Sequence, residues 1–440
     1  MNFVALRTFI HQRQTALLAL LLMCSVYFFS YFQRVAIPGT IFDELQRGFA
    51  TSAGTIAALS SIFLYIYGGM QIGIGLAADR WGGARILLIS GLLMSLGAVW
   101  FPLAHSIPEL YASRILVGLG AGGIFISIVK EIDSLFDVRH FAPVLCVALF
   151  IGYSGGLAGT FPFERLVARL GWRTALLIAG GLCAAAFLAA AILLKHTGRL
   201  RADEPARKAE LYFKDILLNW NSYPVIFAGA VNFSIYFIWQ AVFGKKMLTD
   251  ICGLSSAGAA SVIFFMMLIS MSFITASGFL SRLMGNRRKP IMIACVFLTL
   301  TALVLMTFSL LIHPPDARWM IAGCLMLGLA SSAAVMFSCT MKELNPERAA
   351  GTSIGFSNSF CYLAIAVTAH GAGILMDRFR DQAVSTASAL IYPVSAYRSI
   401  LVLCLIMAGL SAVTVLFIRE SRGICVYRPR DPASGSLPTD

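Results

Sequence analysis

The sequence predicts an all-α membrane protein whose twelve transmembrane helices form two pseudo-symmetric six-helix bundles. Hydrophobic residues make up 58% of the 440 positions and charged residues only 12%, whereas about a quarter of the residues in a soluble domain are charged. The apolar residues recur in stretches of roughly 20, the length that crosses a bilayer as a helix. A charged segment near the middle of the chain divides these stretches six and six. This composition excludes a cytosolic enzyme, a disordered protein and a secreted disulfide scaffold.

Each predicted span is an apolar run between short polar breaks. In chain order, the spans run from Thr15 to Pro38, Ser52 to Ala77, Ala84 to Ala104, Pro108 to Val129, Phe141 to Pro162, Arg173 to Leu194, Tyr223 to Gly244, Gly258 to Leu280, Pro290 to Ile312, Trp319 to Met341, Gly351 to Met376 and Ala396 to Ile418. The first run, about 23 residues long, is too long for the core of a signal peptide, so we interpret it as a span.

The spans give four segments. Residues 1–195 are the predicted N-terminal bundle, 196–222 a cytoplasmic linker, 223–420 the C-terminal bundle and 421–440 a disordered cytoplasmic tail, which is rich in Pro, Ser and Gly from Arg428 onward. The basic residues that mark the linker are Lys195, Arg199, Arg201, Arg207, Lys208 and Lys214.

Basic residues are distributed unevenly between the two sides of the predicted bundles. About two thirds of the 34 lysines and arginines fall on the side that carries both termini and the linker, and cytoplasmic loops are enriched in these residues. We therefore expect a multi-pass protein of the cell inner membrane with both termini in the cytoplasm. The same bias accounts for the net charge of +13 without a nucleic-acid partner. The ten cysteines form no CxxC pair, which favours small buried side chains over a metal or disulfide framework.

A glycine- and charge-containing motif occurs twice, nearly half the chain apart. Its first copy contains Gly75, Asp79, Arg80, Gly82 and Arg85, and its second copy contains Gly278, Arg282, Gly285 and Arg288 at matching spacings. The copies follow the second and the eighth span. Two parallel halves related by an axis along the membrane normal are typical of many secondary transporters.

The stretch from Gly75 to Arg85 resembles the cytoplasmic signature of the major facilitator superfamily between spans two and three. The stretch from Arg114 to Gly120 resembles the fourth-span motif of the same family. The glycine-rich fifth span of the family is matched by Gly152, Gly155, Gly156, Gly159 and Pro162. The resemblance covers nearly the whole chain, and it implies the major facilitator fold and transport by alternating access.

The repeated motif also supplies candidate gating residues. They are Gly75, Asp79, Arg80, Gly82, Arg85, Glu131, Arg282 and Arg288. Asp79 can face the positive N-terminal end of the eleventh span, and the arginines beside it can pair with Glu131 or Asp133 at the end of span four. Such contacts would hold the cytoplasmic side shut. The alternative is that these charges only anchor a loop in the lipid headgroups.

Arg34 is the predicted anion-binding residue. A charged side chain inside a spanning helix is costly, so it usually faces a watery cavity or an anionic partner, and the planar guanidinium suits carboxylate or phosphate. The arrangement resembles the organic-anion and organophosphate branches of the superfamily, where a first-span arginine holds the anion. The alternative is that Arg34 extends to the periplasmic interface. The other candidate substrate-binding residues are Tyr31, Tyr153, Trp239, Gln240 and Asn358.

The sequence differs from those branches in two spans, and the differences narrow the predicted anion and coupling ion. The seventh span reads Tyr236-Phe-Ile-Trp-Gln240 and lacks a second arginine, which argues against a doubly charged phosphate. The fourth span has Ala121-Gly-Gly123 where carboxylate symporters offer a glutamate, so the usual proton carrier is missing. His370 in the eleventh span is the remaining proton-coupling candidate, although a lone helical histidine also occurs as hydrogen-bonded packing.

These observations predict a symporter or exchanger of a small organic anion, acting as a monomer with a proton or a counter-anion as the candidate coupling ion. The alternatives are an exporter of amphipathic or siderophore-like compounds and a membrane receptor built on a transporter fold. No phosphate-binding loop and no spaced set of metal ligands occurs in the sequence, so we expect no cofactor, no metal and no enzymatic activity. An integral membrane enzyme is the least supported alternative.

Overall fold

The computed structural model describes residues 3–136, 138–196, 213–312, 315–346, 350–386 and 389–427. Most of the predicted linker and the part of the tail from Arg428 onward lie outside the described residues. The N-terminal group of helices comprises α1 (Phe3–Val35), the π-helical turn η1 (Ala36–Thr40), α2 (Phe42–Gly48), α3 (Ala53–Trp81), α4 (Gly83–Leu103), α5 (Ile107–Leu135), α6 (Val138–Ala158), α7 (Phe161–Leu170) and α8 (Trp172–His196).

A short helix, α9 (Phe213–Leu217), precedes the C-terminal group. This group comprises α10 (Ser222–Ala241), α11 (Gly244–Asp250), α12 (Ser256–Leu283), α13 (Lys289–Ser309), α14 (Ala317–Ala330), the 3-10 turn η2 (Ser331–Ala333), α15 (Ala334–Leu344), α16 (Ala350–Asp377), the 3-10 turn η4 (Arg380–Gln382), the strands β1 (Val384–Ser385) and β2 (Leu390–Ile391), α17 (Val394–Thr414) and the 3-10 turn η5 (Val415–Phe417). The two strands pair antiparallel and form a small hairpin.

Within the described residues, eleven helices are long and apolar enough to span a membrane, and a bent pair supplies a twelfth. The bent pair joins Val144–Ala158 to Phe161–Leu170 at an angle of 43°, so the predicted fifth span is broken close to its predicted end at Pro162. The tenth span runs through α14, η2 and α15, from Ala317 to Leu344. The predicted all-α membrane architecture is confirmed.

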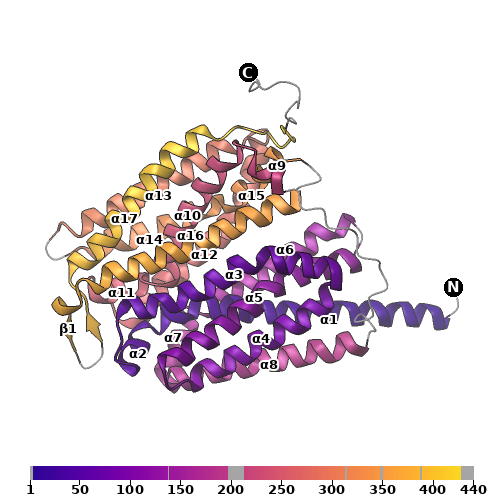
Figure 1. Cartoon of the computed structure of the whole chain (residues 1–440), viewed down its shortest axis with the longest axis horizontal. Helices are drawn as coiled ribbons and strands as arrows, with labels where there is room; N and C mark the ends of the chain where they lie inside the picture. The colour runs from indigo at the N-terminus through magenta and orange to yellow at the C-terminus, as the bar shows by residue number, and fades with distance from the viewer. Residues whose placement is uncertain are drawn as a thin grey trace.

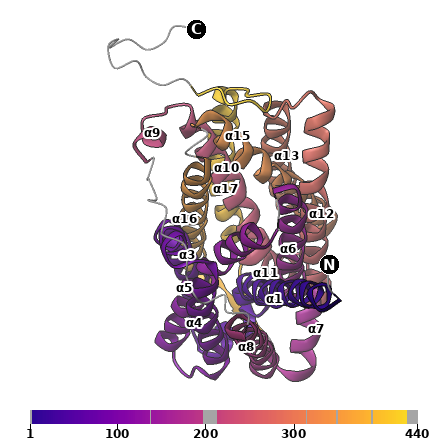
Figure 2. The same ribbon diagram turned by 90° about the vertical axis from the view of Figure 1, so that its right-hand side faces the viewer.

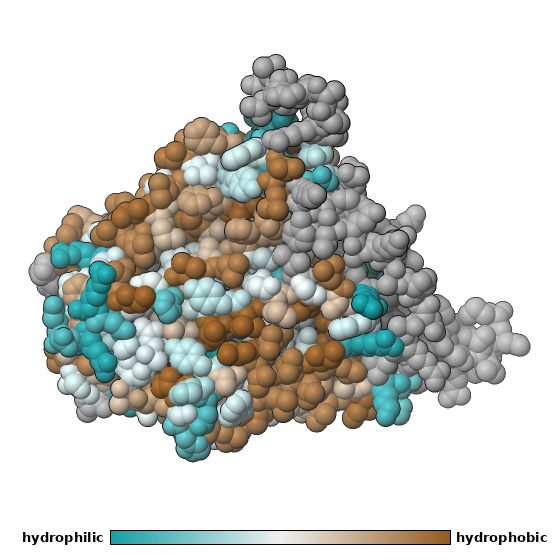
Figure 3. All heavy atoms as spheres, in the orientation of Figure 1, coloured by the Kyte–Doolittle hydropathy of each residue, from teal (hydrophilic) through white to brown (hydrophobic). Residues whose placement is uncertain are grey.

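The two groups of helices lie side by side and diverge toward one end (Figure 1). We call the end with α2, α7, α11 and the hairpin the closed end, and the end where α3 and α12 finish and α9 lies the linker end. Figure 2 views the molecule from the linker end, with α3, α4, α5 and α8 in the lower part of the view and α13, α15 and α16 in the upper part. Apolar side chains cover the flanks of the helices, and hydrophilic side chains gather at the closed end (Figure 3).

The surroundings of the glycines on α3 and α16 show where the two groups of helices are in contact. A Cβ atom added at Gly373 would lie 2.9 Å from Gly54, near the closed end, and one added at Gly68 would lie 3.0 Å from Cβ of Tyr362. Gly75 lies on the same face of α3 two turns beyond Gly68, and nothing lies within 4 Å of a Cβ atom added there. The antiparallel helices α3 and α16 therefore touch from the closed end to the middle of the molecule and then separate.

The two copies of the repeated motif have the same backbone geometry. Gly82 ends α3 with φ +82°, and Gly285 follows α12 with φ +67°; a residue with a Cβ atom rarely adopts this left-handed conformation. Both turns lie at the linker end, because α3 and α12 both begin at the closed end. This explains why glycine recurs at the matching position in each half.

The first residues after the last span are packed, where we predicted a disordered tail from residue 421. The Ser421 hydroxyl donates to Oε2 of Glu343 at 2.5 Å, and the backbone N–H of Val426 donates to the Glu343 carbonyl at 2.9 Å. Residues 421–427 thus form part of the linker end of the C-terminal group.

Candidate functional site

Arg34 lies at the centre of the molecule, in the last turn of α1. The helix changes to the π-helical turn η1 two residues later, and Ile37 within that turn has non-helical backbone angles. The Arg34 side chain is only 3% exposed, which rules out the alternative that it extends to the membrane interface. Its Nη1 atom donates a hydrogen bond of 3.0 Å to the Tyr362 hydroxyl on α16. This contact joins the two groups of helices where α3 and α16 begin to separate.

Aromatic rings surround the guanidinium. Its central carbon lies 4.5 Å from the ring centroids of Tyr31 and Tyr67, 5.1 Å from that of Tyr362 and 5.8 Å from that of Phe63. A cation over an aromatic face is attracted by the ring quadrupole, so these rings stabilise the charge of Arg34, which takes part in none of the ion pairs among the described residues. We call Tyr31, Phe63, Tyr67 and Tyr362 the aromatic cage.

A second layer of aromatic side chains packs on the cage. Tyr153 of α6 meets Tyr31 edge to face at 4.8 Å between centroids, and Phe233 of α10 meets Tyr362 at 6.2 Å. Rings from α1, α3, α6, α10 and α16 therefore converge from both groups of helices. The wall around the guanidinium is therefore formed largely by aromatic rings, some of which carry hydroxyl groups.

Part of the guanidinium has no hydrogen-bond partner. Among the described residues, Nε and Nη2 of Arg34 make no hydrogen bond of normal geometry, although Tyr67 lies beside them. The hydroxyls of Ser60 on α3 and Ser359 on α16 are also buried without a partner. Leaving a buried donor unsatisfied costs about 1–3 kcal/mol, and more when the donor is charged. A carboxylate or sulfonate ligand would satisfy both free nitrogens at once.

Arg114 on α5 is also fully buried, but its donors are satisfied. Its Nε donates to the Leu59 carbonyl at 3.1 Å, Nη1 to the Gln33 carbonyl at 3.1 Å and Nη2 to the Ile37 carbonyl at 3.4 Å. These carbonyls lie beside the break between α1 and η1 and on α3. Arg114 therefore holds the broken backbone next to Arg34 in place and has no free edge for a ligand.

The remaining predicted substrate-binding residues lie in different places. Gln240 is buried at the junction between the groups, where its amide donates to Met267 Sδ at 3.5 Å. Trp239 is fully buried inside the C-terminal group beside Cys404. Asn358 is exposed, although it lies one turn before Tyr362 on the same face of α16. The structure thus brings Tyr31 and Tyr153 to Arg34, places Asn358 at the approach from the linker end, and places Trp239 elsewhere.

His370 lies on the outer surface of α16. It is exposed, and it lies between Val367 and Ile374, which are 60% and 50% exposed and belong to the lipid-facing side of the helix. This position separates His370 from the aromatic cage and from the ion pairs described below. The geometry gives the predicted proton-coupling residue no contact with the candidate site.

Buried ion pairs join the two groups at the closed end. Lys245 of α11 donates to Oε2 of Glu164 on α7 and to the Thr40 carbonyl, both at 2.5 Å, and the Ser256 hydroxyl donates to the other Glu164 oxygen at 2.5 Å. Lys245 is only 8% exposed and Glu164 only 4% exposed. Removing one partner of such a buried pair is strongly destabilising, so this contact favours the closed arrangement.

A second lysine strengthens the same junction. Lys246 Nζ lies 2.7 Å from Asp43 on α2 and 2.8 Å from Asp250 on its own helix, and it donates to the Leu390 carbonyl of the hairpin at 2.7 Å. The Tyr397 hydroxyl donates to Asp250 at 2.7 Å. We call Asp43, Glu164, Lys245, Lys246 and Asp250 the closed-end ion cluster.

The N-terminal end of α3 is also bound by a residue of the C-terminal group. Asp377, the last residue of α16, accepts hydrogen bonds from the Ser52 hydroxyl at 2.7 Å and from the Gly54 backbone N–H at 2.9 Å. A carboxylate at a helix N-terminus is stabilised by the unpaired N–H groups and the helix dipole. Sequence analysis predicted this kind of contact for Asp79, whose side chain lies outside the described part of the structure.

Burial raises the pKa of two carboxyl groups at the closed end. Burial raises the pKa of Glu44 above its ordinary value, against the opposing effect of Lys245, and one Glu44 oxygen has no hydrogen-bond partner among the described residues. Burial likewise raises the pKa of Asp250, against the opposing effect of Lys246. Glu44 and Asp250 are therefore protonated more readily than ordinary carboxyl groups, although Lys245 and Lys246 oppose the effect.

At the linker end, the two halves repeat one arrangement that the sequence analysis missed. Glu131, near the end of α5, is buried with its Oε1 atom beside Gly83 at the start of α4. Glu343, at the end of α15, forms an ion pair with Arg288 before α13. A Lys-Glu pair, Lys130-Glu131 and Lys342-Glu343, stands at this position in each half, and this recurrence was the available signal. Arg80, Arg85 and Arg282 are exposed at the same end.

Sequence reasoning also missed Tyr67, Tyr362 and the closed-end ion cluster. The two tyrosines carry no local signal, because only the packing of three helices brings them to Arg34. The cluster had a weak signal: Lys245 and Lys246 are adjacent lysines on the predicted non-cytoplasmic side, where positive charge is unfavoured. Buried acids on other segments explain why they are there.

Comparison with known proteins gives a consistent result. Residues 23–369 match the family model described as Major Facilitator Superfamily. The chain is 28% identical over 160 residues to the probable sulfoacetate transporter SauU of Cupriavidus necator, covering 36% of each chain. It is 29% identical over 172 residues to human monocarboxylate transporter 11, covering 38% of this chain and 35% of that protein. Both alignments therefore span about a third of the relative's own length.

Solved structures share the fold. A bacterial homologue of the human lysosomal transporter Spinster, in an inward-facing and occupied conformation, superimposes with a TM-score of 0.72 at 15% sequence identity. The superposition covers 91% of this chain and 96% of that chain.

Proposed function

Because the chain belongs to the Major Facilitator Superfamily, we propose that it is a secondary transporter of a small organic anion that works by alternating access in the inner membrane. The observation that carries the proposal is the buried Arg34 guanidinium with two unpartnered nitrogens, Nε and Nη2. It lies between the two groups of helices, where a solute site accessible from either side must be.

The chemistry of the aromatic cage narrows the class of solute. One guanidinium edge donates two parallel hydrogen bonds to one carboxylate or sulfonate. The rings of Tyr31, Tyr67 and Tyr362 favour a small organic body over a hydrated inorganic ion. The names of the relatives, a probable sulfoacetate transporter and a monocarboxylate transporter, agree with this class. We therefore expect a small organic solute that places one anionic group at Arg34; a monocarboxylate has only that group, whereas sulfoacetate would place either its sulfonate or its carboxylate there.

The described geometry corresponds to the state open toward the linker end. The closed-end ion cluster and the Asp377 contact shut one side, while the faces of α3 and α16 beyond Gly68 and Tyr362 are apart. With the linker and both termini on the cytoplasmic side, this is the inward-facing state. We propose that the Arg34–Tyr362 contact acts as the pivot, because it lies at the boundary between the closed and the separated parts.

Transport then alternates between two sets of contacts. Opening the closed end requires the pairs Lys245–Glu164 and Lys246–Asp43 to separate, and closing the linker end requires the glycine face of α3 to approach α16. An anion at Arg34 would contact residues of both groups and so favour the intermediate in which both ends are shut. Each chain contains both groups and a complete site, which supports a monomer.

Uptake into proteoliposomes tests the proposal. The purified chain is reconstituted and assayed with radiolabelled sulfoacetate and a panel of monocarboxylates, with Arg34→Ala, Arg34→Lys and, as a control, Arg318→Gln. Arg318 is paired with Asp316 at the surface and is 90% exposed. We expect saturable flux of at least one anion, a loss of at least tenfold in both Arg34 variants, and unchanged flux in the control.

Other outcomes identify the alternatives. Binding of an anion without flux would indicate a receptor. Flux of large amphipathic cations or neutral compounds that does not depend on Arg34 would indicate an exporter. Equal anion flux in Arg34→Ala and the wild type, with equal amounts of protein in the vesicles, would refute the role of Arg34.

A further inference from the structure

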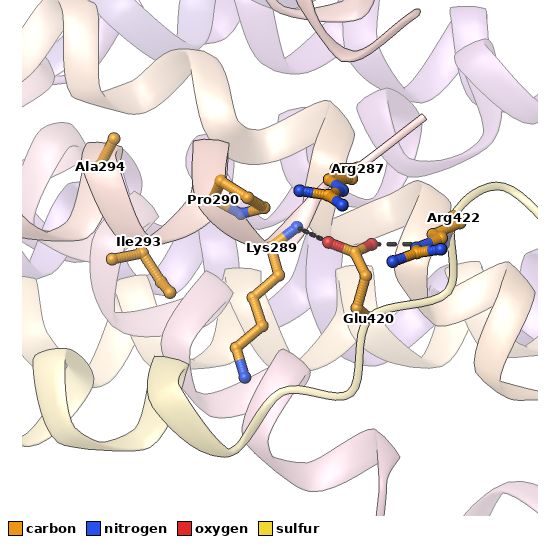
Figure 4. A pocket seen from close by; sticks show the side chains of 7 residues that line it. All are labelled: Arg287, Lys289, Pro290, Ile293, Ala294, Glu420 and Arg422. Atoms are coloured by element: carbon orange, nitrogen blue, oxygen red, sulfur yellow. Dashed lines mark hydrogen bonds between the residues drawn. The ribbon is translucent and has the colours of Figure 1, made fainter. Parts of the chain in front are cut away.

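A basic surface pocket lies at the linker end of the C-terminal group, away from the aromatic cage. Its volume is about 570 Å³, and it is lined by Arg287, Lys289, Pro290, Ile293, Ala294, Glu420 and Arg422. The lining residues come from the start of α13 and from the segment that follows η5. Figure 4 shows the guanidinium groups of Arg287 and Arg422 on one side of the pocket and Ile293 and Ala294 on the other.

The pocket carries net positive charge. Its one acid, Glu420, accepts hydrogen bonds from the backbone N–H groups of Arg288 at 3.1 Å, Lys289 at 3.1 Å and Arg422 at 3.2 Å. These bonds use both carboxylate oxygens and hold the tail segment against the start of α13. Three cationic side chains therefore line the pocket against one carboxylate that is already engaged by backbone donors.

The cations differ in how they are held. Lys289 Nζ donates to the Leu416 carbonyl at 2.7 Å, and Arg288, whose side chain lies outside the pocket lining, forms an ion pair with Glu343. Arg287 and Arg422 are exposed, and both line the pocket, Arg287 from the turn before α13 and Arg422 from the segment after η5 (Figure 4). Two guanidinium groups that line one pocket can donate hydrogen bonds to the oxygens of a phosphodiester.

The floor of the pocket continues into lipid-facing surface. Pro290 and Ala294 begin a stripe on α13 that continues through Phe297, Val304 and Phe308, which are 44%, 52% and 48% exposed. The neighbouring end of the last span presents Val413, Leu416 and Phe417, which are 59%, 50% and 72% exposed. α13 packs against α17, so the two apolar surfaces lie next to each other directly beneath the basic residues.

We propose that this pocket binds an anionic phospholipid, with the headgroup phosphate at Arg287 and Arg422 and an acyl chain along the surfaces of α13 and α17. A basic pocket between helices at the membrane surface has the chemistry that recognises anionic headgroups. The continuity between the charged rim and the apolar stripe favours a lipid over a soluble phosphate, which would use only the rim. The bound lipid would hold residues 420–422 against the start of α13.

Native mass spectrometry of the full chain in detergent tests this proposal. The protein is titrated with dioleoyl phosphatidylglycerol, with dioleoyl phosphatidylcholine, which has the same acyl chains, and with glycerol phosphate, which has none. The variants are Arg287→Gln/Arg422→Gln and Ala294→Trp, and the control is Arg282→Gln, an exposed arginine at the same end outside the pocket. None of the variants changes Glu420, so its hydrogen bonds with the backbone N–H groups of Arg288, Lys289 and Arg422 are kept.

We expect phosphatidylglycerol to bind at least fivefold more tightly than phosphatidylcholine and the arginine double variant to lose this preference. Ala294→Trp fills the apolar floor, so it should weaken phosphatidylglycerol binding while the arginines remain. Arg282→Gln should bind like the wild type. The proposal is overturned if the double variant and Arg282→Gln retain equal phosphatidylglycerol binding, or if glycerol phosphate binds as tightly as the lipid. If the double variant fails to fold, Ala294→Trp against Arg282→Gln still decides the outcome.

Discussion

Arg34 and Arg114 show how the same residue type serves two purposes inside one bundle. Both are buried, but Arg114 gives its hydrogen bonds to backbone carbonyls and Arg34 keeps two nitrogens free. The sequence alone predicted Arg34 as the ligand residue because of its position in an apolar helix. The sequence could not show that Arg114 has a structural role and Arg34 a ligand-binding role. The carbonyls that accept hydrogen bonds from Arg114 come from α3 and from the helix break after α1, which are distant in sequence.

Stability measurements distinguish the two arginines. Arg114→Leu leaves the carbonyls of Gln33, Leu59 and Ile37 without their donor, and each buried unsatisfied group costs about 1–3 kcal/mol. We expect its thermal unfolding midpoint in detergent to fall by several degrees. Arg34→Leu removes a buried cation of which only Nη1 forms a hydrogen bond among the described residues. We therefore expect the unfolding midpoint of this variant to be unchanged or higher in the absence of solute. Equal destabilisation by both substitutions would contradict this division.

At the scale of the helix, the pair α3 and α16 determines which end is open. Small residues on a common face let the helices touch from Gly54 to Gly68, and the same face is free at Gly75. Hydropathy and the repeated motif predicted both helices and the glycine-containing turn. The point at which the helices separate could not be predicted, because the proposed alternating access would require one sequence to contain the contacts of two states.

Two glycine substitutions on that face should have opposite effects. Gly75→Leu adds a side chain where nothing lies within 4 Å, so we expect normal folding and solute binding but little transport, because the linker end can no longer close. Gly68→Leu places its side chain against Tyr362, so we expect lower stability and weaker solute binding. Thermal unfolding, equilibrium binding and uptake separate these effects. Normal uptake by Gly75→Leu would show that this face does not close.

The closed end should respond to pH through Glu44. Burial raises the pKa of this carboxyl in the closed state above the ordinary glutamate value of about 4.3. Deprotonation on raising the pH therefore disfavours the closed arrangement, and protonation on lowering the pH favours it. We expect the distance between spin labels at Arg47 and Arg380, in a cysteine-free background, to become shorter on average as the pH falls from neutral toward the ordinary glutamate pKa of about 4.3.

Matched variants test whether Glu44 is responsible. Glu44→Gln should remove most of the pH dependence and resemble the low-pH state. Asp316→Asn, which changes a partly exposed acid paired with Arg318 at the same end, should leave the dependence intact. A pH response that persists in Glu44→Gln would assign it to another group, of which Asp250 is the first to examine because its pKa is also raised by burial.

At the scale of the whole molecule, charge asymmetry and the twofold repeat were sufficient to predict the architecture. The turns after α3 and α12 lie at the same end, as parallel halves require. The arrangement of the two halves in space was beyond the sequence, since it depends on the ion cluster of five residues from α2, α7 and α11. Asp43 and Glu164 reach the two lysines of α11 only after the halves have met.

Labelling of intact cells tests the orientation. In a cysteine-free background, a cysteine at Val384 in the hairpin, which is 63% exposed, should react with a membrane-impermeant maleimide. A cysteine at Ile424, which is 64% exposed at the linker end, should react only after the cells are permeabilised. The reverse pattern would place the linker outside and invert the inward-facing assignment.

The single cation of the cage also has an electrical consequence. None of the described ion pairs includes Arg34, so a bound monoanion would lower the positive charge at the centre by one, while the buried Arg114, held by neutral carbonyls, keeps its charge with or without the solute. Membrane voltage would then act more strongly on the return of the empty carrier than on the loaded step. One elementary charge is worth about 2.3 kcal/mol per 100 mV. Uptake of a lone monoanion into a negatively polarised cell is opposed by that amount, and release outward is driven by it, unless a cation travels with the solute.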